Sequence, residues 1–162
     1  MVAVGRLYKT APLHSWKTAK ALRMKHYHEV MEARGKGKLI VSGGTEGFVG
    51  LPAGLGDYVY LGGEPYGATI GSDPQFSQIC SEAVEARGFA RDLCSYMRNY
   101  WGSMFLNRFY FGGEFPKPDF CLQMNFCDSH AKWYQLVSDY YGVPYFSIDV
   151  PMTMEPGKNS KS

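Results

Sequence analysis

A strand, a helix and a second strand follow one another within about 30 residues near the end of the chain. Residues 119–126 (DFCLQMNF) and 144–150 (PYFSIDV) are apolar runs typical of buried strands. Between them, Asp128 or Ser129 can cap a helix that runs to Tyr141 and ends at Gly142. Strands joined by a helical crossover pair in parallel, and the ligands of such sheets bind beyond the carboxyl ends of the strands. The chain is therefore predicted to build an α/β unit.

The rest of the chain supplies further elements for this unit. Apolar residues at helical spacing predict a first helix, and Asp73 with Pro74 is a strong helix start. Short apolar runs predict two more strands, and the glycine-rich segments after them (GGTEG and GGEPYG) are predicted as turns. The expected helices span residues 15–34, 74–87 and 91–106, and the expected strands span residues 38–42 and 57–61. Together these elements indicate a Rossmann-like three-layer unit with a short parallel sheet.

Three regions are expected along the chain. Residues 1–37 form a helical lead-in, residues 38–151 form the Rossmann-like domain, and residues 152–162 form a disordered tail, because that polar segment has nothing to bury. At 162 residues the chain is long enough for one hydrophobic core.

Composition excludes several classes of function. The formal net charge is only +2 and the basic residues are scattered, so nucleic-acid binding is not indicated. No stretch reaches the roughly 20 apolar residues of a membrane span, and the first residues lack the pattern of a signal peptide. We therefore expect a cytoplasmic protein without membrane contact. Its four cysteines are then more typical of thiols or metal ligands than of disulfides.

Cys94 and Cys127 are the candidate metal ligands. Each is predicted near a helix start, where the partial positive charge of the helix N-terminus favours a thiolate. Neither has a second cysteine in a CxxC spacing, so the fold must bring them together. The alternative is that both are buried structural thiols. Cys121, inside a strand, and Cys80, inside a helix, are interpreted as core residues.

The amino-acid sequence of residues 64–151 resembles that of one protein family. The segments GEPYGA, SEAVEARGFARDLCSYMRNYWGSMFLNRF, FGGEFPKPDF and NFCDSHAKWYQLVSDYYGVPYFSIDVP carry the resemblance. The family is that of benzoyl-CoA reductases and 2-hydroxyacyl-CoA dehydratases, and the likeness is strongest to the B-type catalytic subunit of ATP-dependent benzoyl-CoA reductase.

The resemblance implies a cofactor, partners and a reaction. Family members hold a [4Fe-4S] cluster through three cysteines between two Rossmann-like domains, and they work as heterodimers of related subunits. A separate ATP-hydrolysing iron-sulfur activator delivers single electrons, so ATP belongs to that partner. The electron either begins the reduction of the aromatic ring of benzoyl-CoA or forms a ketyl radical from a 2-hydroxyacyl-CoA. The first outcome, in an anaerobic oxidoreductase acting on an acyl-CoA, is the main expectation.

The same resemblance places two cluster ligands in this chain. They are Cys94 and Cys127, and the third ligand normally lies in the second domain. Family subunits are more than twice as long, so the chain is expected to be an N-terminal fragment with little activity by itself. Two alternatives stay open: a subunit of a 2-hydroxyacyl-CoA dehydratase, or a non-catalytic assembly module without a complete cluster site.

Other residues have both a functional and an ordinary interpretation. Glu46 is a candidate for proton transfer or a solvated loop carboxylate, and His130 can donate a hydrogen bond near a cluster sulfur or make ordinary helix contacts. The glycines 43, 44 and 47 would permit close approach of a ligand. The aromatic residues Trp101, Trp133, Tyr134 and Tyr141 are more typical of a core or subunit interface than of a substrate platform.

Overall fold

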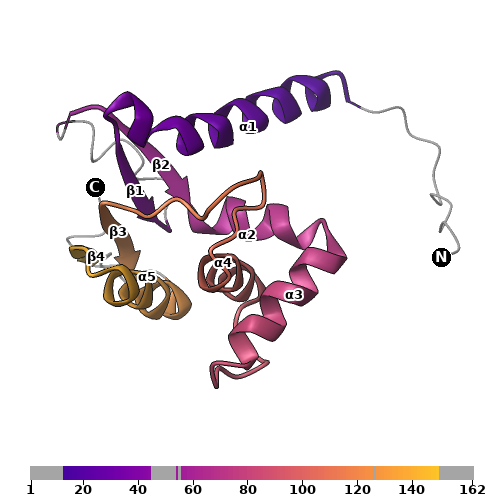
Figure 1. The fold of residues 1–162 in the computed structure, drawn as a ribbon, viewed down its shortest axis with the longest axis vertical. Coiled ribbons are helices and arrows are strands. Elements are labelled where there is room, and N and C mark those ends of the chain that lie inside the picture. The colour runs from indigo at the N-terminus through magenta and orange to yellow at the C-terminus, as the bar shows by residue number, and fades with distance from the viewer. Residues whose placement is uncertain (1–12, 45–53, 55, 126, 150–162) are drawn as a thin grey trace, which may run out of the picture.

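A computed structural model describes residues 13–44, 54, 56–125 and 127–149 of the chain. The elements follow the order helix, strand, strand, three helices, strand, helix, strand (Figure 1). Their bounds are α1 Ser15–Glu32, a 3-10 turn at Arg34–Lys36, β1 Leu39–Gly43, β2 Tyr58–Gly62, α2 Gly63–Gly71, α3 Pro74–Glu85, α4 Ser95–Phe105, β3 Phe120–Asn125, α5 Asp128–Tyr141 and β4 Tyr145–Asp149. The tail predicted at 152–162 lies outside the described residues.

The four strands form one parallel sheet in the order β2-β1-β3-β4. Val41 of β1 aligns with Tyr60 of β2 on one side and with Phe120 of β3 on the other. The β3–α5–β4 unit predicted from the sequence is confirmed, with Leu122 aligned with Phe146. The fold is therefore the expected α/β, Rossmann-like class.

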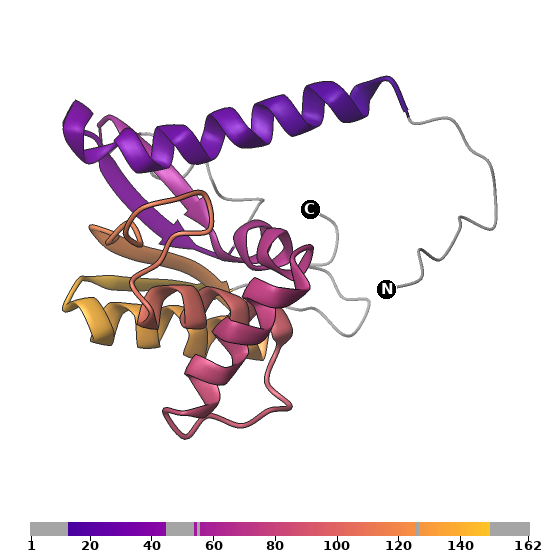
Figure 2. The same ribbon diagram turned by 45° about the vertical axis from the view of Figure 1, so that its right-hand side comes forward.

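Two crossovers place the helices. The connection from β2 to β3 contains α2, α3 and α4 and passes β1, whereas the connection from β3 to β4 contains α5. Because right-handed crossovers that run in the same direction put their helices on the same face of a sheet, α4 and α5 become neighbours. Both views show them side by side below the strands, with α1 on the β2 side of the molecule (Figures 1 and 2).

One predicted turn is a helix. The segment GGEPYG was expected to be a turn, but it opens α2, which Gly62 precedes in extended conformation. The helix forms because it buries Tyr66 and Ile70 completely. Gly67 is present for packing, since a Cβ at this position would lie 2.3 Å from the carbonyl oxygen of Tyr96 at the start of α4. Glycine therefore permits close contact between two helices here.

Two helix starts also differ slightly from the prediction. The helix expected from residue 91 begins at Ser95, so Cys94 is the residue before the helix and not part of its first turn. Asp128 and Ser129 were the expected caps of α5, but Cys127 occupies the cap position with an extended backbone. Both cysteines are thus the N-cap residues of their helices.

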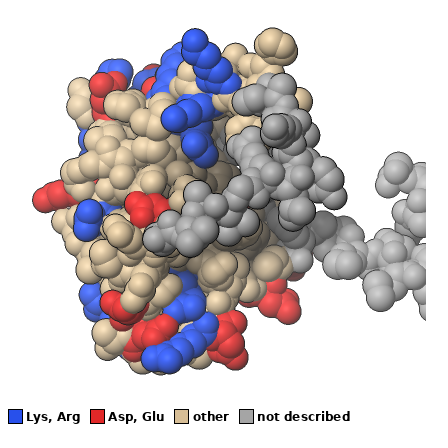
Figure 3. Space-filling model, turned by 90° about the vertical axis from the view of Figure 1, so that its right-hand side faces the viewer, with Lys and Arg blue, Asp and Glu red and all other residues tan. Residues whose placement is uncertain are grey.

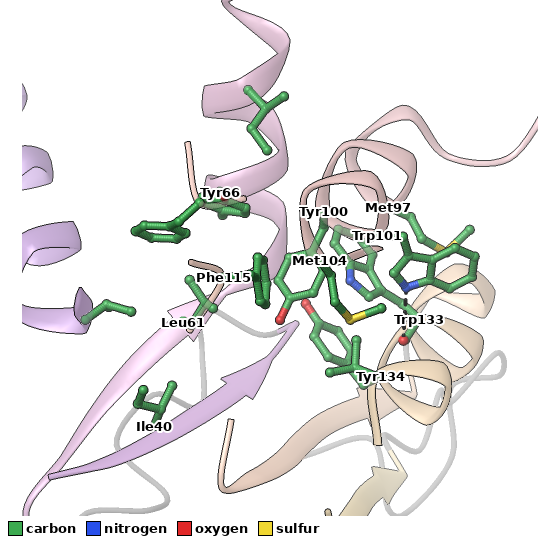
Figure 4. Packing of buried hydrophobic residues seen from close by; sticks show 14 of the residues in the cluster. Ile40, Leu61, Tyr66, Met97, Tyr100, Trp101, Met104, Phe115, Trp133 and Tyr134 are labelled. Carbon is green, nitrogen blue, oxygen red and sulfur yellow. Dashed lines mark hydrogen bonds between the residues drawn. The ribbon is translucent and has the colours of Figure 1, made fainter. Parts of the chain in front are cut away.

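The core is built from aromatic rings between the sheet and the helices (Figure 4). Trp133 and Tyr134 of α5 are completely buried, and Trp101 of α4 donates its indole N–H to the carbonyl oxygen of Trp133 at 3.3 Å. The Tyr100 hydroxyl lies 2.6 Å from Oγ of Ser42 on β1. These contacts join α4, α5 and the sheet, and they confirm the interpretation of Trp101, Trp133 and Tyr134 as core residues.

Cys80 and Cys121 are buried members of the same core, as predicted. Burial raises the pKa of each thiol to about 12, because the thiolate would lose its hydration. Both are therefore neutral at physiological pH, which is unlike the state of a metal ligand.

Charge is mixed on the surface. On the face drawn in Figure 3, basic side chains are interspersed with acidic and uncharged ones. Among the described residues, every helix is too short or too polar to cross a membrane.

Candidate active site at the carboxyl ends of the strands

The strand order changes the direction of winding at one point of the sheet. The chain leaves β1 toward β2 on one side, while β3 pairs with β1 on the other side. Open parallel sheets bind ligands where the direction of winding changes in this way, beyond the carboxyl ends of the two strands. Here that point lies between the ends of β1 and β3, at Gly43 and Asn125.

Cys127 lies at this point. It follows β3, caps α5 and is half-buried, and its carbonyl oxygen accepts a hydrogen bond from the backbone N–H of His130 at 2.9 Å. Its side chain makes no capping hydrogen bond. The sulfur therefore has no structural task in capping the helix.

Cys94 has the corresponding position on α4. It is half-buried, and its carbonyl oxygen accepts from the N–H of Arg98 at 3.0 Å. The loop before it is fastened by Glu85 of α3, which pairs with Nε of Arg91 at 2.8 Å and with Arg98. Arg98 also donates to the carbonyl oxygen of Arg91 at 2.9 Å. One carboxylate thus ties the end of α3 to the start of α4.

The two cysteines begin helices that are in contact. Trp101 and Trp133, which form the hydrogen bond between α4 and α5, come seven residues after Cys94 and six after Cys127. At about 1.5 Å of rise per residue, the two helix starts lie at similar levels along the helix axes. Each also presents the partial positive charge of a helix N-terminus.

This arrangement fits one part of an iron-sulfur cluster site. Two half-buried thiols, on neighbouring helix starts and without capping duty, suit thiolate ligands of iron. Within the described ranges, no group of three His, Cys, Asp or Glu side chains is arranged to hold a metal ion. By residue type and position, Cys94 and Cys127 are therefore candidate ligands, and the described residues supply no third one.

His130 has a buried ionic partner that sequence reasoning missed. Its Nε2 pairs with a carboxylate oxygen of Glu64, and the side chains are 8% and 20% exposed. Glu64 lies in the first turn of α2, directly beyond the end of β2. The candidate carboxylate chosen from the sequence, Glu46, lies outside the described residues. The local sequence does not identify Glu64 as a site residue, because the segment that contains it was predicted as a turn. Its only signal is an acidic side chain near a helix N-terminus.

The glycines at the strand ends serve protein packing. A Cβ on Gly43 would lie 2.1 Å from the carbonyl oxygen of Leu122, and one on Gly44 would lie 2.5 Å from the Tyr134 ring. Gly63 similarly leaves room for Tyr134, since a Cβ on Gly63 would lie 2.0 Å from the hydroxyl oxygen of that side chain. The close approach expected at Gly43 and Gly44 is therefore to protein atoms, while Gly47 lies outside the described residues.

Two other polar features lie near the carboxyl ends of the strands. Burial, together with the nearby charge of Glu64, raises the pKa of Tyr134 well above its usual value, so the phenol stays neutral beside the carboxylate. At the ends of β3 and β4, Asn125 donates to Asp149 at 2.7 Å and accepts from Ser147 at 3.0 Å. Sequence reasoning missed this polar pairing because it depends on the register of β3 with β4.

A separate groove runs along the outer side of α4 and α5. Its volume is about 900 Å³, and its walls include Leu93, Trp101, Phe105 and Leu136. One lining residue, Leu93, directly precedes Cys94 in the sequence. The groove itself is lined by no cysteine and by no His–Glu pair. The titratable side chains Glu64, His130 and Tyr134 lie together at the strand ends instead.

The fold and the candidate site define a parallel α/β protein with two cysteine-capped helices near the carboxyl ends of its strands. The chain matches the family described as 2-hydroxyglutaryl-CoA dehydratase, D-component, over residues 59–161. This match covers more than half of the chain, and the chain belongs to that family.

Two characterised relatives are similar to part of the chain. The (R)-phenyllactyl-CoA dehydratase alpha subunit of Clostridium sporogenes is 30% identical over 93 residues, which are 57% of this chain and 22% of the relative. The (R)-2-hydroxyisocaproyl-CoA dehydratase alpha subunit of Clostridioides difficile is 33% identical over 79 residues, 48% of this chain and 19% of the relative. The similarity spans about a fifth of each relative's length. Both names favour the dehydratase alternative over the benzoyl-CoA reductase that was the main expectation.

Proposed function

We propose that the chain is the cluster-binding portion of a 2-hydroxyacyl-CoA dehydratase-type subunit. The family match supports this class, and the two relatives, both alpha subunits of dehydratases that act on 2-hydroxyacyl-CoA thioesters, support the reaction. The observation that carries the proposal is the pair of cysteine N-caps, Cys94 and Cys127. They begin two contacting helices near the carboxyl ends of the strands.

Cys94 and Cys127 would hold two iron atoms of a [4Fe-4S] cluster, with a third ligand from outside the described residues. When bound, such a cluster supplies single-electron transfer to the acyl-CoA. The chain's own residues then orient the cluster: α4 and α5 fix the two sulfurs, and the buried rings beneath them keep water from one side. We place this domain at residues 38–151, as the first of two.

The proposed protein works with partners. Alpha subunits imply a second, related subunit, and we propose a heterodimer in which both contribute to the substrate site. Electrons would come from a separate ATP-hydrolysing iron-sulfur activator. No residue pattern of a phosphate-binding Walker loop occurs in the sequence, so ATP chemistry is assigned to that activator.

Anaerobic reconstitution tests the cluster. The chain is incubated with iron and sulfide, and bound iron is measured together with the electron paramagnetic resonance spectrum of the reduced sample. We expect iron binding that Cys94→Ala and Cys127→Ala each reduce strongly, because two thiolates are the ligands available. Cys80→Ala and Cys121→Ala are the matched controls, and both should retain the iron of the parent chain. Equal binding by all four variants, or none by the parent, would instead support the assembly module.

A substrate comparison tests the reaction. The complete enzyme, with its partner subunit and activator, is supplied with a 2-hydroxyacyl-CoA or with benzoyl-CoA under anaerobic conditions. Loss of water from the hydroxyacyl thioester without ring reduction is the expected result. Ring reduction of benzoyl-CoA without dehydration would show that the protein is a reductase of the kind that the sequence wording resembles.

A further inference from the structure

Glu64 and His130 are distant in sequence but joined in the fold. Glu64 lies in the first turn of α2, which directly follows β2. His130 lies in the first turn of α5, which follows β3. β2 and β3 lie on opposite sides of β1, so the pair formed by the Glu64 carboxylate and the His130 imidazole spans the carboxyl end of β1. The pair therefore links the two halves of the sheet across the carboxyl end of β1.

The pair leaves little room for movement. His130 is 8% exposed and Glu64 is 20% exposed. A Cβ on Gly44, the residue after β1, would lie 3.1 Å from both Oε1 of Glu64 and Nδ1 of His130. The rings of Trp133 and Tyr134 pack against His130, with centroids 6.0 and 6.2 Å away. The backbone of β1 and the aromatic core thus confine the two side chains.

The same histidine fixes the backbone of Cys127. The His130 N–H donates to the carbonyl oxygen of Cys127 at 2.9 Å, which closes the first turn of α5 at the cysteine. The residue that carries the imidazole is therefore hydrogen-bonded through its backbone to Cys127. Cys94 has its own fastening through Glu85 and Arg98, which does not include Glu64.

We propose that Glu64 is a positioning residue for Cys127: by holding His130, it fixes the first turn of α5 and the direction of the Cys127 side chain. The proposal rests on the proposed function in so far as the positioned sulfur is a cluster ligand. The contact between Glu64 and His130, and the hydrogen bond from His130 to Cys127, are properties of the protein alone. Removing the carboxylate should loosen one cysteine while the other keeps its place.

Hydrogen exchange on the cluster-free chain tests the positioning role. Amide exchange is measured for the first turn of α5 (residues 128–132) and, in the same molecule, for the first turn of α4 (residues 95–99). In Glu64→Ala, exchange in the first segment should become about tenfold faster, because local opening no longer breaks a buried ion pair. The α4 segment should change less than about twofold, since it retains Glu85.

Two further variants separate positioning from loss of stability. Glu64→Gln keeps an oxygen that accepts from the imidazole, so it should restore most of the slow exchange. In the double variant Glu64→Ala/His130→Ala, exchange should be no faster than in the faster single variant, because both changes break one contact. Glu29→Gln, on exposed α1, is a matched change of charge that should leave both segments unaltered.

The opposite results would overturn the proposal. Unchanged exchange at residues 128–132 in Glu64→Ala, or equal acceleration of the α4 and α5 segments in that variant, would show that the pair has no specific effect on Cys127. After iron reconstitution, Glu64→Ala should also change the paramagnetic resonance spectrum while Glu29→Gln retains that of the parent. Normal iron binding with unchanged exchange would reject the positioning role alone, whereas faster exchange in a chain that never binds iron would reject the cluster and leave the positioning role intact.

Discussion

At the scale of single residues, Asp73 shows how strong a local signal can be. Its side chain accepts hydrogen bonds from the N–H groups of Gln75 and Phe76, each at 3.2 Å, and Pro74 follows as the first helical residue. Asp73→Ala would leave both N–H groups without this acceptor, and we expect a loss of about 1 kcal/mol in the free energy of unfolding. Urea denaturation checks this value. Asp92→Ala, at an exposed loop position, is the control and should change stability by less than about 0.5 kcal/mol.

The candidate site was only partly predictable from individual residues. Cys94, Cys127 and His130 stand beside helix starts that turn chemistry and apolar runs make visible. Glu64 was missed because its importance comes from His130, a partner on another element. Ion pairs between distant segments have no local pattern, so the sequence alone could not connect them.

At the scale of elements, glycine sets how closely the helices pack. A Cβ on Gly102 of α4 would lie 2.2 Å from the carbonyl oxygen and 2.4 Å from Cα of Cys80 on α3. Backbone atoms cannot rotate away, so Gly102→Ala should force the two helices apart and lower the free energy of unfolding by about 3 kcal/mol. Thermal denaturation followed by circular dichroism measures the loss.

Gly35→Ala is the control for this prediction. No atom lies within 4 Å of a Cβ at Gly35, so its substitution should change stability by less than about 0.5 kcal/mol. If both variants unfold at the same temperature, close backbone contact between α3 and α4 is not what Gly102 provides.

The same property explains why α2 was predicted as a turn. Gly63 and Gly67 are usual in turns, but here they fit beneath Tyr134 and against the backbone of Tyr96. Most other elements were predictable because apolar periodicity and caps agree with their tertiary role, as in α3 and in the β3–α5–β4 unit. The sequence alone does not show whether a glycine is needed for a turn or for close packing. Here the packing role becomes visible only from the neighbouring side chains and backbone.

At the scale of the whole molecule, the buried thiols should make the free energy of unfolding depend on pH. Cys80 and Cys121 have pKa values of about 12 in the folded state, above their ordinary value of 9.0. The neutral thiol is favoured by folding, so this stabilisation is complete below pH 9 and is lost as the pH rises toward 12. Between pH 8 and pH 10 each thiol ionises in the unfolded chain but stays neutral in the folded protein. This difference should lower the free energy of unfolding by about 1.4 kcal/mol for each cysteine.

Urea denaturation at pH 8 and pH 10 measures this loss. The double variant Cys80→Ala/Cys121→Ala should lose clearly less stability between the two pH values than the parent chain. Part of the remaining loss is expected from the phenols whose pKa values burial raises in the same direction, which are Tyr27, Tyr66, Tyr100, Tyr134 and Tyr141. An identical pH dependence in parent and double variant would show that the two thiols ionise as easily in the folded protein as in the unfolded chain.

The placement of the three tryptophans gives the protein distinct optical reporters. Trp101 and Trp133 are 2% and 0% exposed and join α4 to α5 beside the two cysteine-capped helix starts, whereas Trp16 on α1 is 67% exposed. We therefore expect the emission of the buried pair to be blue-shifted and shielded from dissolved quenchers, and that of Trp16 to be red-shifted and open to them. A coloured cofactor at the two cysteines would absorb energy from the buried pair first, so the fluorescence of the native chain can distinguish events at the binding edge from events on α1.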